Sequence, residues 1–274
     1  MAVQKTEAIV IGHYALKETD KIIVFYSKEY GRIRAVAKGV RRLKSKLCGR
    51  MEIMTHGILV FYERENKDLH IVNSFDTIET FQDLRENLVK FTYCSYFAEL
   101  IQQVEPENEA NVEIFNLLLY MMLMMKTNKD PEMLARAFEI NLLEKIGLSP
   151  RLDSCTLCSS NLSFFQKSLS KKLGYNFNQA SGLKISFSVS EGGILCDDCS
   201  KAVPNCIFIS RGTLELMKRI QQTPLDLITR LRISQTNRLE LKKVLSEFIS
   251  FHIDIRNLRS LAFLDSLDLL IDNQ

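Results

Sequence analysis

Short segments rich in β-branched and aromatic residues follow one another through the first eighty residues of the chain. Polar turn sequences such as residues 28–31 and 63–68 separate them, and the segments themselves cover residues 8–12, 21–26, 32–37, 58–62 and 69–72. Five closely spaced strands leave the edges of an open sheet poorly protected, and a small closed barrel removes those edges. The pattern therefore predicts a five-stranded OB-fold β-barrel.

The hydrophobic period becomes helical after residue 76. Thr80 and Asp83 are placed like a capping box before the first helix, and Pro106 follows its end. Apolar positions at helical spacing predict further helices at about 110–127, 130–147, 213–222, 224–231 and 236–257. Residues 150–209 have no clear period and contain most of the cysteines, which indicates an irregular inserted module.

Four of the seven cysteines form two Cys-x-x-Cys pairs, which are separated by the 37 residues 159–195. Two residues between ligands allow both sulfurs to reach one tetrahedral ion, and two such pairs complete a four-thiolate shell. We predict one structural Zn²⁺ per chain, since a closed shell leaves no position for a catalytic water. The predicted ligands are Cys155, Cys158, Cys196 and Cys199.

Two other interpretations of these cysteines are four reduced thiols in a small core and a redox pair. The long separation between the pairs requires a hairpin or small sheet, for which residues 164–166, 174–177 and 183–187 are the candidate strands. The resulting fold class is multi-domain α+β. It comprises an OB-fold nucleic-acid-binding domain (residues 1–79), an α-helical domain (80–150 and 207–274) and a zinc-ribbon insertion (151–206).

Composition narrows the class of protein further. The chain has 274 residues, 46% hydrophobic and 25% charged, which is typical of a globular protein. Its longest apolar run, residues 117–125, is far shorter than the roughly 20 residues of a membrane helix, and no signal peptide is evident. We therefore expect a soluble, cytoplasmic protein, in which seven cysteines favour thiols or metal over disulfides.

Positive charge is concentrated in one short stretch, although the net charge of the whole chain is only +3. Residues 28–50 contain nine Lys and Arg and a single acid, Glu29. Such an array repels itself and would be stabilised by an extended polyanion. Cations that share one face of a strand, together with those of the loop after it, form the predicted DNA-binding surface: Arg32, Arg34, Lys38, Arg41, Arg42, Lys44 and Lys46.

A solvated loop that only aids solubility is the simpler interpretation of this charge. Its place on an OB barrel favours binding, because OB grooves follow single-stranded backbones with cations and stack bases on aromatic side chains. Tyr14, Tyr26, Tyr30 and Tyr62 are the stacking candidates, and each is otherwise expected to lie in the barrel core or at its rim.

No catalytic constellation is apparent. The sequence has no P-loop, no GxGxxG after a strand and no HExxH, and its four histidines lack ligand or triad spacing. Glu105, Glu107 and Glu109 form an acidic loop that we expect to be solvated. The chain is therefore interpreted as a binding protein and not an enzyme.

Three segments, in order, resemble the family of the bacterial DNA repair protein RecO, a recombination mediator. They are residues 18–46, 136–158 and 187–199, and the resemblance extends over nearly the whole chain. It implies binding of single- and double-stranded DNA, annealing of complementary strands, and work with RecR to load RecA onto DNA coated by single-strand-binding protein. It also implies a nucleoid-associated location.

The resemblance further implies a pocket for the C-terminal tail of single-strand-binding protein, an apolar groove with a cation for the terminal carboxylate. Arg136, Lys218 and Arg219 are candidates for that cation. Three alternatives remain from the residues themselves: an RNA-binding protein of translation or RNA metabolism, an interaction scaffold with an incidental basic loop, and a zinc-dependent hydrolase.

Overall fold

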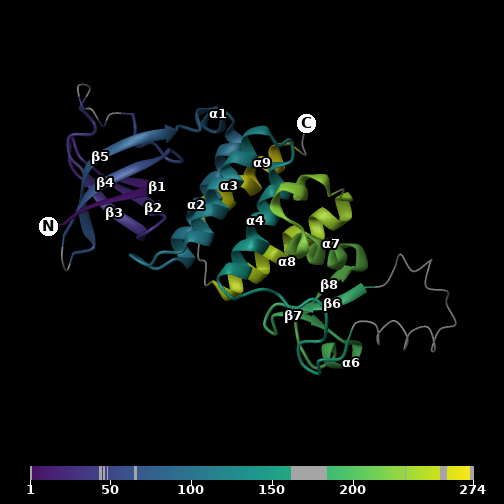
Figure 1. Ribbon diagram of the computed structural model, residues 1–274. Coiled ribbons are helices and arrows are strands. Elements are labelled where there is room, and N and C mark those ends of the chain that lie inside the picture. Colours follow the sequence, from purple (N-terminus) through teal and green to yellow (C-terminus); the bar gives the residue numbers. More distant parts are fainter. Residues whose placement is uncertain are drawn as a thin grey trace. The chain divides into compact units, whose positions relative to one another are not determined.

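The structure is a computed structural model, and it describes residues 2–271 apart from 43, 44, 46, 48, 65, 66, 162–183, 232 and 254–257 (Figure 1). The predicted strands at 164–166 and 174–177 therefore lie outside the described residues. The chain forms two compact units, residues 1–135 with 257–274 and residues 136–256, and each is described by itself. The predicted three-part division at residues 79, 150 and 206 follows the order of the elements and stays a prediction.

Five strands form the closed barrel that the sequence predicts: β1 (Ala2–Ala15), β2 (Lys21–Ser27), β3 (Gly31–Ala37), β4 (His56–Glu63) and β5 (Leu69–Glu79). Their order around the barrel is β1-β2-β3-β5-β4, with β3 and β5 parallel and the other neighbours antiparallel. The first strand is longer than predicted because it pairs with β2 through residues 8–15 and with β4 through residues 2–9. It thereby closes the barrel and leaves no free edge.

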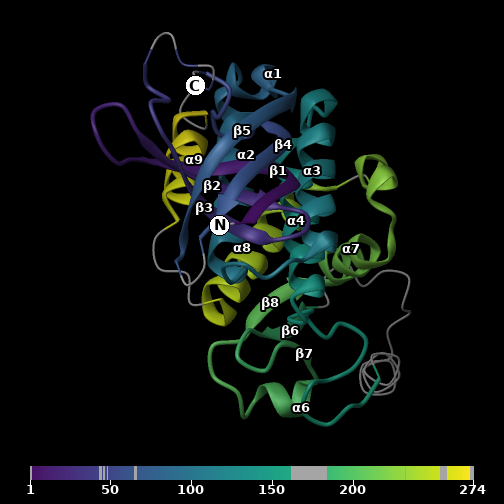
Figure 2. The same ribbon diagram turned by 60° about the vertical axis from the view of Figure 1, so that its left-hand side comes forward.

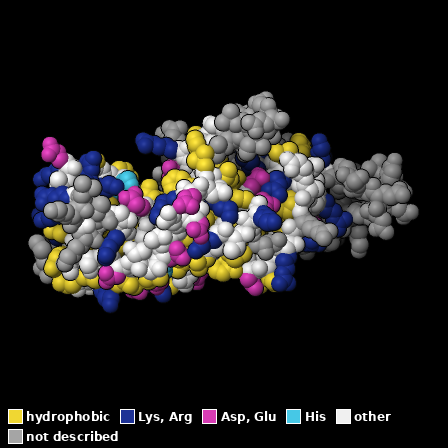
Figure 3. All heavy atoms as spheres, turned by 90° about the horizontal axis from the view of Figure 1, so that it is seen from above, with side chains coloured by type: hydrophobic (Ala, Val, Ile, Leu, Met, Phe, Trp, Pro, Cys, Tyr) yellow, Lys and Arg dark blue, Asp and Glu magenta, His cyan; other side chains and the backbone are white. Residues whose placement is uncertain are grey.

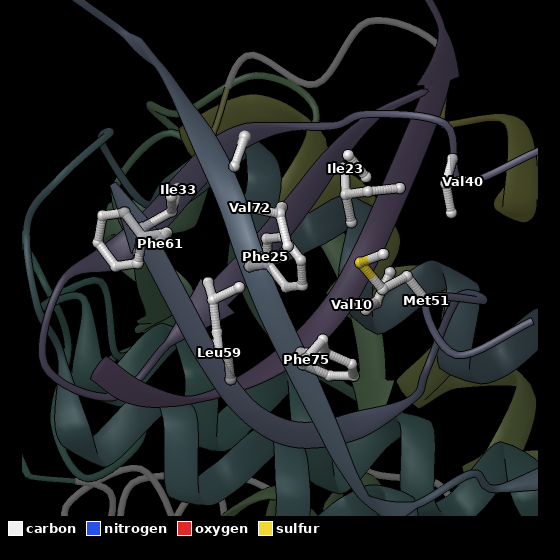
Figure 4. Packing of buried hydrophobic residues seen from close by; sticks show 13 residues of the cluster. Val10, Ile23, Phe25, Ile33, Val40, Met51, Leu59, Phe61, Val72 and Phe75 are labelled. Carbon is white, nitrogen blue, oxygen red and sulfur yellow. The ribbon is translucent and has the colours of Figure 1, made fainter. Parts of the chain in front are cut away.

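Side chains that alternate along the strands fill the barrel (Figure 4). Ile33 and Ala35 of β3 point inward, together with Phe25 of β2, whose ring lies 5.5 Å from that of Phe75. Residues of opposite parity, such as Arg32 and Arg34, therefore leave the outer face of the same strand. The alternation fixes which side chains are available for binding.

Helices cover part of the outer face of the barrel (Figures 1 and 2). They are α1 (Gln82–Arg85), α2 (Leu88–Val104), α3 (Val112–Thr127) and α9 (Arg259–Ile271), which packs against α2. The predicted capping box is wrong: Phe81, buried in a left-handed conformation, precedes α1, and the side chain of Asn87 caps α2. Helix α9 was not predicted, and the preceding helix ends at His252 and not near residue 257.

The second unit combines helices with a small sheet. It contains most of α4 (Pro131–Lys145), then α6 (Asp197–Ser200), α7 (Arg211–Gln222), the 3₁₀ helix η2 (Leu225–Arg230) and α8 (Gln235–His252). Its sheet has the order β7-β6-β8, from β6 (Lys184–Ser188), β7 (Gly193–Leu195) and β8 (Ile207–Ser210). Phe187 of β6 packs on Phe248 of α8, with ring centroids 6.0 Å apart. Thus the sheet and α8 share a core.

The N-terminal barrel, the helical region and the clustered cysteines confirm the predicted fold class. Among the described residues, no helix is both long enough and apolar enough to span a membrane.

Gly31 gives a test of how closely the acidic loop packs on the barrel. Its φ is +62°, and an added Cβ would lie 1.8 Å from the carbonyl oxygen of Glu109. We expect Gly31→Ala to lower the free energy of unfolding by roughly 1–3 kcal/mol and to lower the melting temperature. The matched control is Gly49→Ala, because Gly49 also has a positive φ but has open space around it. Equal melting temperatures for the two variants would show that the contact does not constrain the fold.

Candidate nucleic-acid interface and metal centre

Three exposed cations lie together in the loop after β3. The strand ends at Ala37, and Lys38, Arg41 and Arg42 then follow with exposed side chains, while Gly39 turns the backbone at a φ of +63°. Figure 3 shows Lys and Arg side chains gathered over one end of the barrel. The last two predicted cations, Lys44 and Lys46, lie outside the described residues.

A single carboxylate fixes the path of this loop. Asp20 Oδ1 accepts a hydrogen bond from the backbone N–H of Gly39 at 2.8 Å and another from the Thr19 hydroxyl at 3.0 Å. The backbone N–H of Arg41 donates to the carbonyl oxygen of Thr19 at 3.1 Å. The hydrogen bond from Gly39 is the main cause of the lowered pKa of Asp20, so the carboxylate that anchors the loop is ionised at neutral pH.

Arg32 and Arg34 leave the same face of β3, as their parity predicts, but neither is fully free. Arg32 Nη1 donates to the carbonyl oxygen of Gln102 at 2.7 Å, and its Nη2 lies 3.5 Å from Glu107. Arg34 Nη2 lies 3.0 Å from the other oxygen of Glu107, although 41% of the Arg34 side chain remains exposed. Arg32 therefore joins the barrel to the end of α2, and Arg34 keeps part of its charge open to a ligand.

The expectation of a solvated acidic loop is wrong for Glu105 and Glu107. Glu105 is only 6% exposed, its pKa is raised by burial, and it accepts a hydrogen bond from the hydroxyl of Tyr26 at 3.0 Å. Tyr26 is fully buried, and burial also raises the pKa of its hydroxyl. The sequence pattern did not reveal this partner set, since the two residues are 79 positions apart.

The four candidate tyrosines therefore separate in the structure. Tyr26 lies against α3 and the Glu105 carboxylate, where no base can reach it. Tyr30 donates to Gln4 at 2.8 Å and packs edge-on against Phe61, and Tyr62 is half-buried. Tyr14 alone among the four is open, with 58% of its surface exposed.

The four predicted cysteine ligands come together in the second unit. The sulfur atoms of Cys155, Cys158, Cys196 and Cys199 all lie within 4.8 Å of one another, and those of Cys158 and Cys196 are 3.7 Å apart. Sulfurs at 2.3 Å from a tetrahedral ion are separated by about 3.8 Å, so the cluster has the size of such a site. The residues thus fit a metal ion held by four thiolates.

Backbone hydrogen bonds shape both halves of this cluster. The first pair forms a turn in which the N–H of Ser159 donates to the carbonyl of Cys155 at 3.0 Å, with Ser159 at a φ of 57°. Cys196 follows β7 and caps α6, and its sulfur accepts from the N–H of Cys199 at 3.3 Å. Its own N–H donates to the Cys155 sulfur at 3.4 Å. These bonds fix the positions of the Cys155 and Cys196 sulfurs.

Two of the thiols, Cys158 and Cys199, have pKa values shifted in opposite directions by their hydrogen bonds. The neighbouring Ser160 hydroxyl, 2.9 Å away, is the main cause of the lowered pKa of Cys158, about 6. The hydrogen bond of Cys199 to Cys196 is the main cause of its raised pKa, about 12. Since a cation among the sulfurs stabilises all of them as thiolates, metal binding should release protons. Cys206 packs against the cluster but its Sγ donates to the carbonyl of Val203 and does not join the metal group.

The three cations suggested for a carboxylate pocket differ in accessibility. Arg136 is buried, with a side chain only 4% exposed, and it pairs with Glu139 at 3.0 Å, so it is not available to a ligand. Lys218 pairs with Asp153 at 2.8 Å, and Arg219 is exposed. Of the three, Arg219 alone has an exposed side chain.

A closed barrel with a basic loop, joined to a helical region with a four-cysteine metal site, is typical of nucleic-acid-binding proteins. The family model "Recombination protein O N terminal" matches residues 1–81, and "Recombination protein O C terminal" matches residues 85–262. The chain therefore belongs to the RecO family, which supports a role in DNA repair and recombination.

Individual relatives agree with this assignment. The chain is 35% identical to the DNA repair protein RecO of Pelotomaculum thermopropionicum, over 97% of this chain and 94% of the relative. It is 32% identical to the RecO protein of Alkaliphilus metalliredigens, over 94% and 96% of the two chains. It is also 31% identical to that of Roseiflexus sp., over 97% and 86%.

Replacement of one ligand tests the metal centre. We expect Cys196→Ser to lower the bound metal to well below half an equivalent per chain, because the remaining three thiolates no longer close the shell. Elemental analysis of protein purified without a chelator measures the metal content per chain. Cys206→Ser is the control, since this thiol lies beside the cluster and outside the ligand set. Equal metal content in the two variants would contradict the assignment of ligands.

Proposed function

We propose that the chain is a recombination mediator that binds single- and double-stranded DNA through the basic surface of its barrel and anneals complementary strands. The single observation that carries this proposal is the exposed set Lys38, Arg41 and Arg42, whose side chains form no ion pair within the described part of the chain. Arg34 lies on the strand that leads into this loop, and Lys44 and Lys46, which are outside the described residues, continue the basic stretch in the sequence. Family membership supports the choice of DNA as the ligand.

Annealing follows from the physics of such a surface. Two complementary strands carry like charges, and cations that displace their counterions reduce the repulsion between them. Contacts to phosphates leave the edges of the bases free to pair, since these contacts carry no sequence information. The hydrogen bonds of Gly39 and Arg41 hold the start of the loop against the turn between β1 and β2, so these cations lie at the barrel surface before DNA binds.

We propose that the metal is Zn²⁺ in a structural role. Four thiolates in a tetrahedral arrangement are the ligand set that zinc prefers in structural sites. The bound ion would supply folding free energy to the region around β7 and α6, whose elements are too short to bury a core of their own. The sulfurs of Cys155 and Cys196 belong to the small cluster that packs there.

We propose that RecR, RecA and single-strand-binding protein are the partners of this activity. Membership of the RecO family supports this proposal. In it, the chain works with RecR to load RecA onto DNA coated by single-strand-binding protein and contacts the C-terminal tail of the latter. The second unit, with exposed Arg219, is the part of the chain that we assign to that tail.

Charge reversal in the loop tests the DNA-binding surface. We expect Arg41→Glu with Arg42→Glu to weaken binding to single-stranded DNA by at least about tenfold and to slow annealing, because two attractive contacts become repulsive. Fluorescence anisotropy measures the affinity, and metal content should stay unchanged. Lys129→Glu with Lys243→Glu is the control, since it alters two exposed cations outside the barrel and gives the same net charge. Equal affinities of the two double variants would refute the assigned surface.

A further inference from the structure

A hollow lies on the outer face of the barrel and includes Arg34 of the predicted DNA-binding surface. Its volume is about 450 Å³, and its lining comes from Tyr14, Ile22, Arg34, Lys67, Asp68 and Leu69. These residues belong to β1, β2, β3, β5 and the turn before β5, so the hollow crosses the sheet instead of following one strand.

The register of the strands explains why the ring of Tyr14 and the apolar side chains of Ile22 and Leu69 line the same hollow. Tyr14 is opposite Ile22 across β1 and β2, and Arg34 is opposite Leu69 across β3 and β5. Ile23 and Ile33, the sequence neighbours of Ile22 and Arg34, point into the barrel core, so the hollow lies on the outer face. Helices cover other residues of this face, such as Tyr26, but Tyr14 keeps 58% of its surface exposed.

The charges around the hollow suit a phosphate better than a second apolar side chain. Arg34 keeps 41% of its side chain exposed beside Glu107, and Lys67 is exposed with no ion pair within the described residues. Asp68 is the opposing charge of the lining. The turn that follows β1 contacts the basic loop, because Arg41 Nη1 donates to the carbonyl of Lys17, three residues after Tyr14, at 3.5 Å.

We propose that this hollow is a subsite for one unpaired nucleobase, which stacks on Tyr14 while the adjoining phosphate contacts Arg34 and Lys67. The proposal rests on the proposed DNA-binding function and adds a preference to it. Bases in a duplex are covered on both faces by their neighbours, whereas an unpaired base can stack on an exposed ring. The basic loop binds any phosphate chain, and the Tyr14 subsite selects single strands.

The test separates contacts to bases from contacts to phosphates. The variants are Tyr14→Ala, Tyr14→Phe and, as a control, Phe208→Ala, which removes an aromatic ring of 59% exposure from the second unit. The ligands are an oligothymidylate, an abasic oligonucleotide of equal length with the same phosphates, and a duplex. We expect Tyr14→Ala to bind oligothymidylate about tenfold more weakly than the parent does. Its affinities for the abasic strand and for the duplex should equal those of the parent. Tyr14→Phe should keep the parent affinity.

Several outcomes would overturn the subsite. The first is that Tyr14→Ala loses the same affinity for the oligothymidylate as for the abasic strand. The second is that Tyr14→Ala loses affinity for neither ligand. The third is that the parent protein binds the two ligands with equal affinity. The melting temperature of Tyr14→Ala should equal that of the parent, since the ring is largely exposed. Loss of affinity in the Arg41 and Arg42 double variant with no loss in Tyr14→Ala would refute the subsite alone. Unchanged affinity in that double variant would instead refute the proposed surface.

Discussion

The ionised carboxylate of Asp20 is the constraint on which the basic surface depends. Lys38, Arg41 and Arg42 repel one another, and a loop of such composition would spread apart in solution if its backbone were not held. The hydrogen bond from Gly39 to Asp20, and that from Arg41 to Thr19, tie the loop to the turn between β1 and β2. The same turn follows Tyr14, whose place on the barrel is set by its pairing with Ile22 of β2.

Strand β3 divides its side chains between stability and binding. Ile33 and Ala35 fill the barrel. The outward cations of the strand and of the residue after it have fewer protein partners and greater exposure toward the C-terminal end. Arg32 is used to hold the end of α2, Arg34 is shared with Glu107, and Lys38 is open to solvent. The metal centre lies in the other compact unit and is built from local turns and sulfur contacts.

The sequence predicted the parts of the structure that depend on local pattern. Alternating apolar residues and short turns predicted the barrel, and the spacing of the two Cys-x-x-Cys pairs predicted the ligand cluster. It did not predict contacts between distant residues, such as Glu107 with Arg34 or Glu105 with Tyr26. The exposure of Tyr14 depends on which half of the barrel the helices cover, and no periodicity within β1 contains that information.

The salt dependence of binding to single-stranded DNA tests the central claim most directly. If the six predicted cations other than Arg32 each meet one phosphate, the logarithm of the association constant should fall against the logarithm of salt concentration with a slope of about −4. The account predicts this slope, with a smaller magnitude after charge reversal at Arg41 and Arg42. An affinity that does not change between low and moderate salt would contradict it.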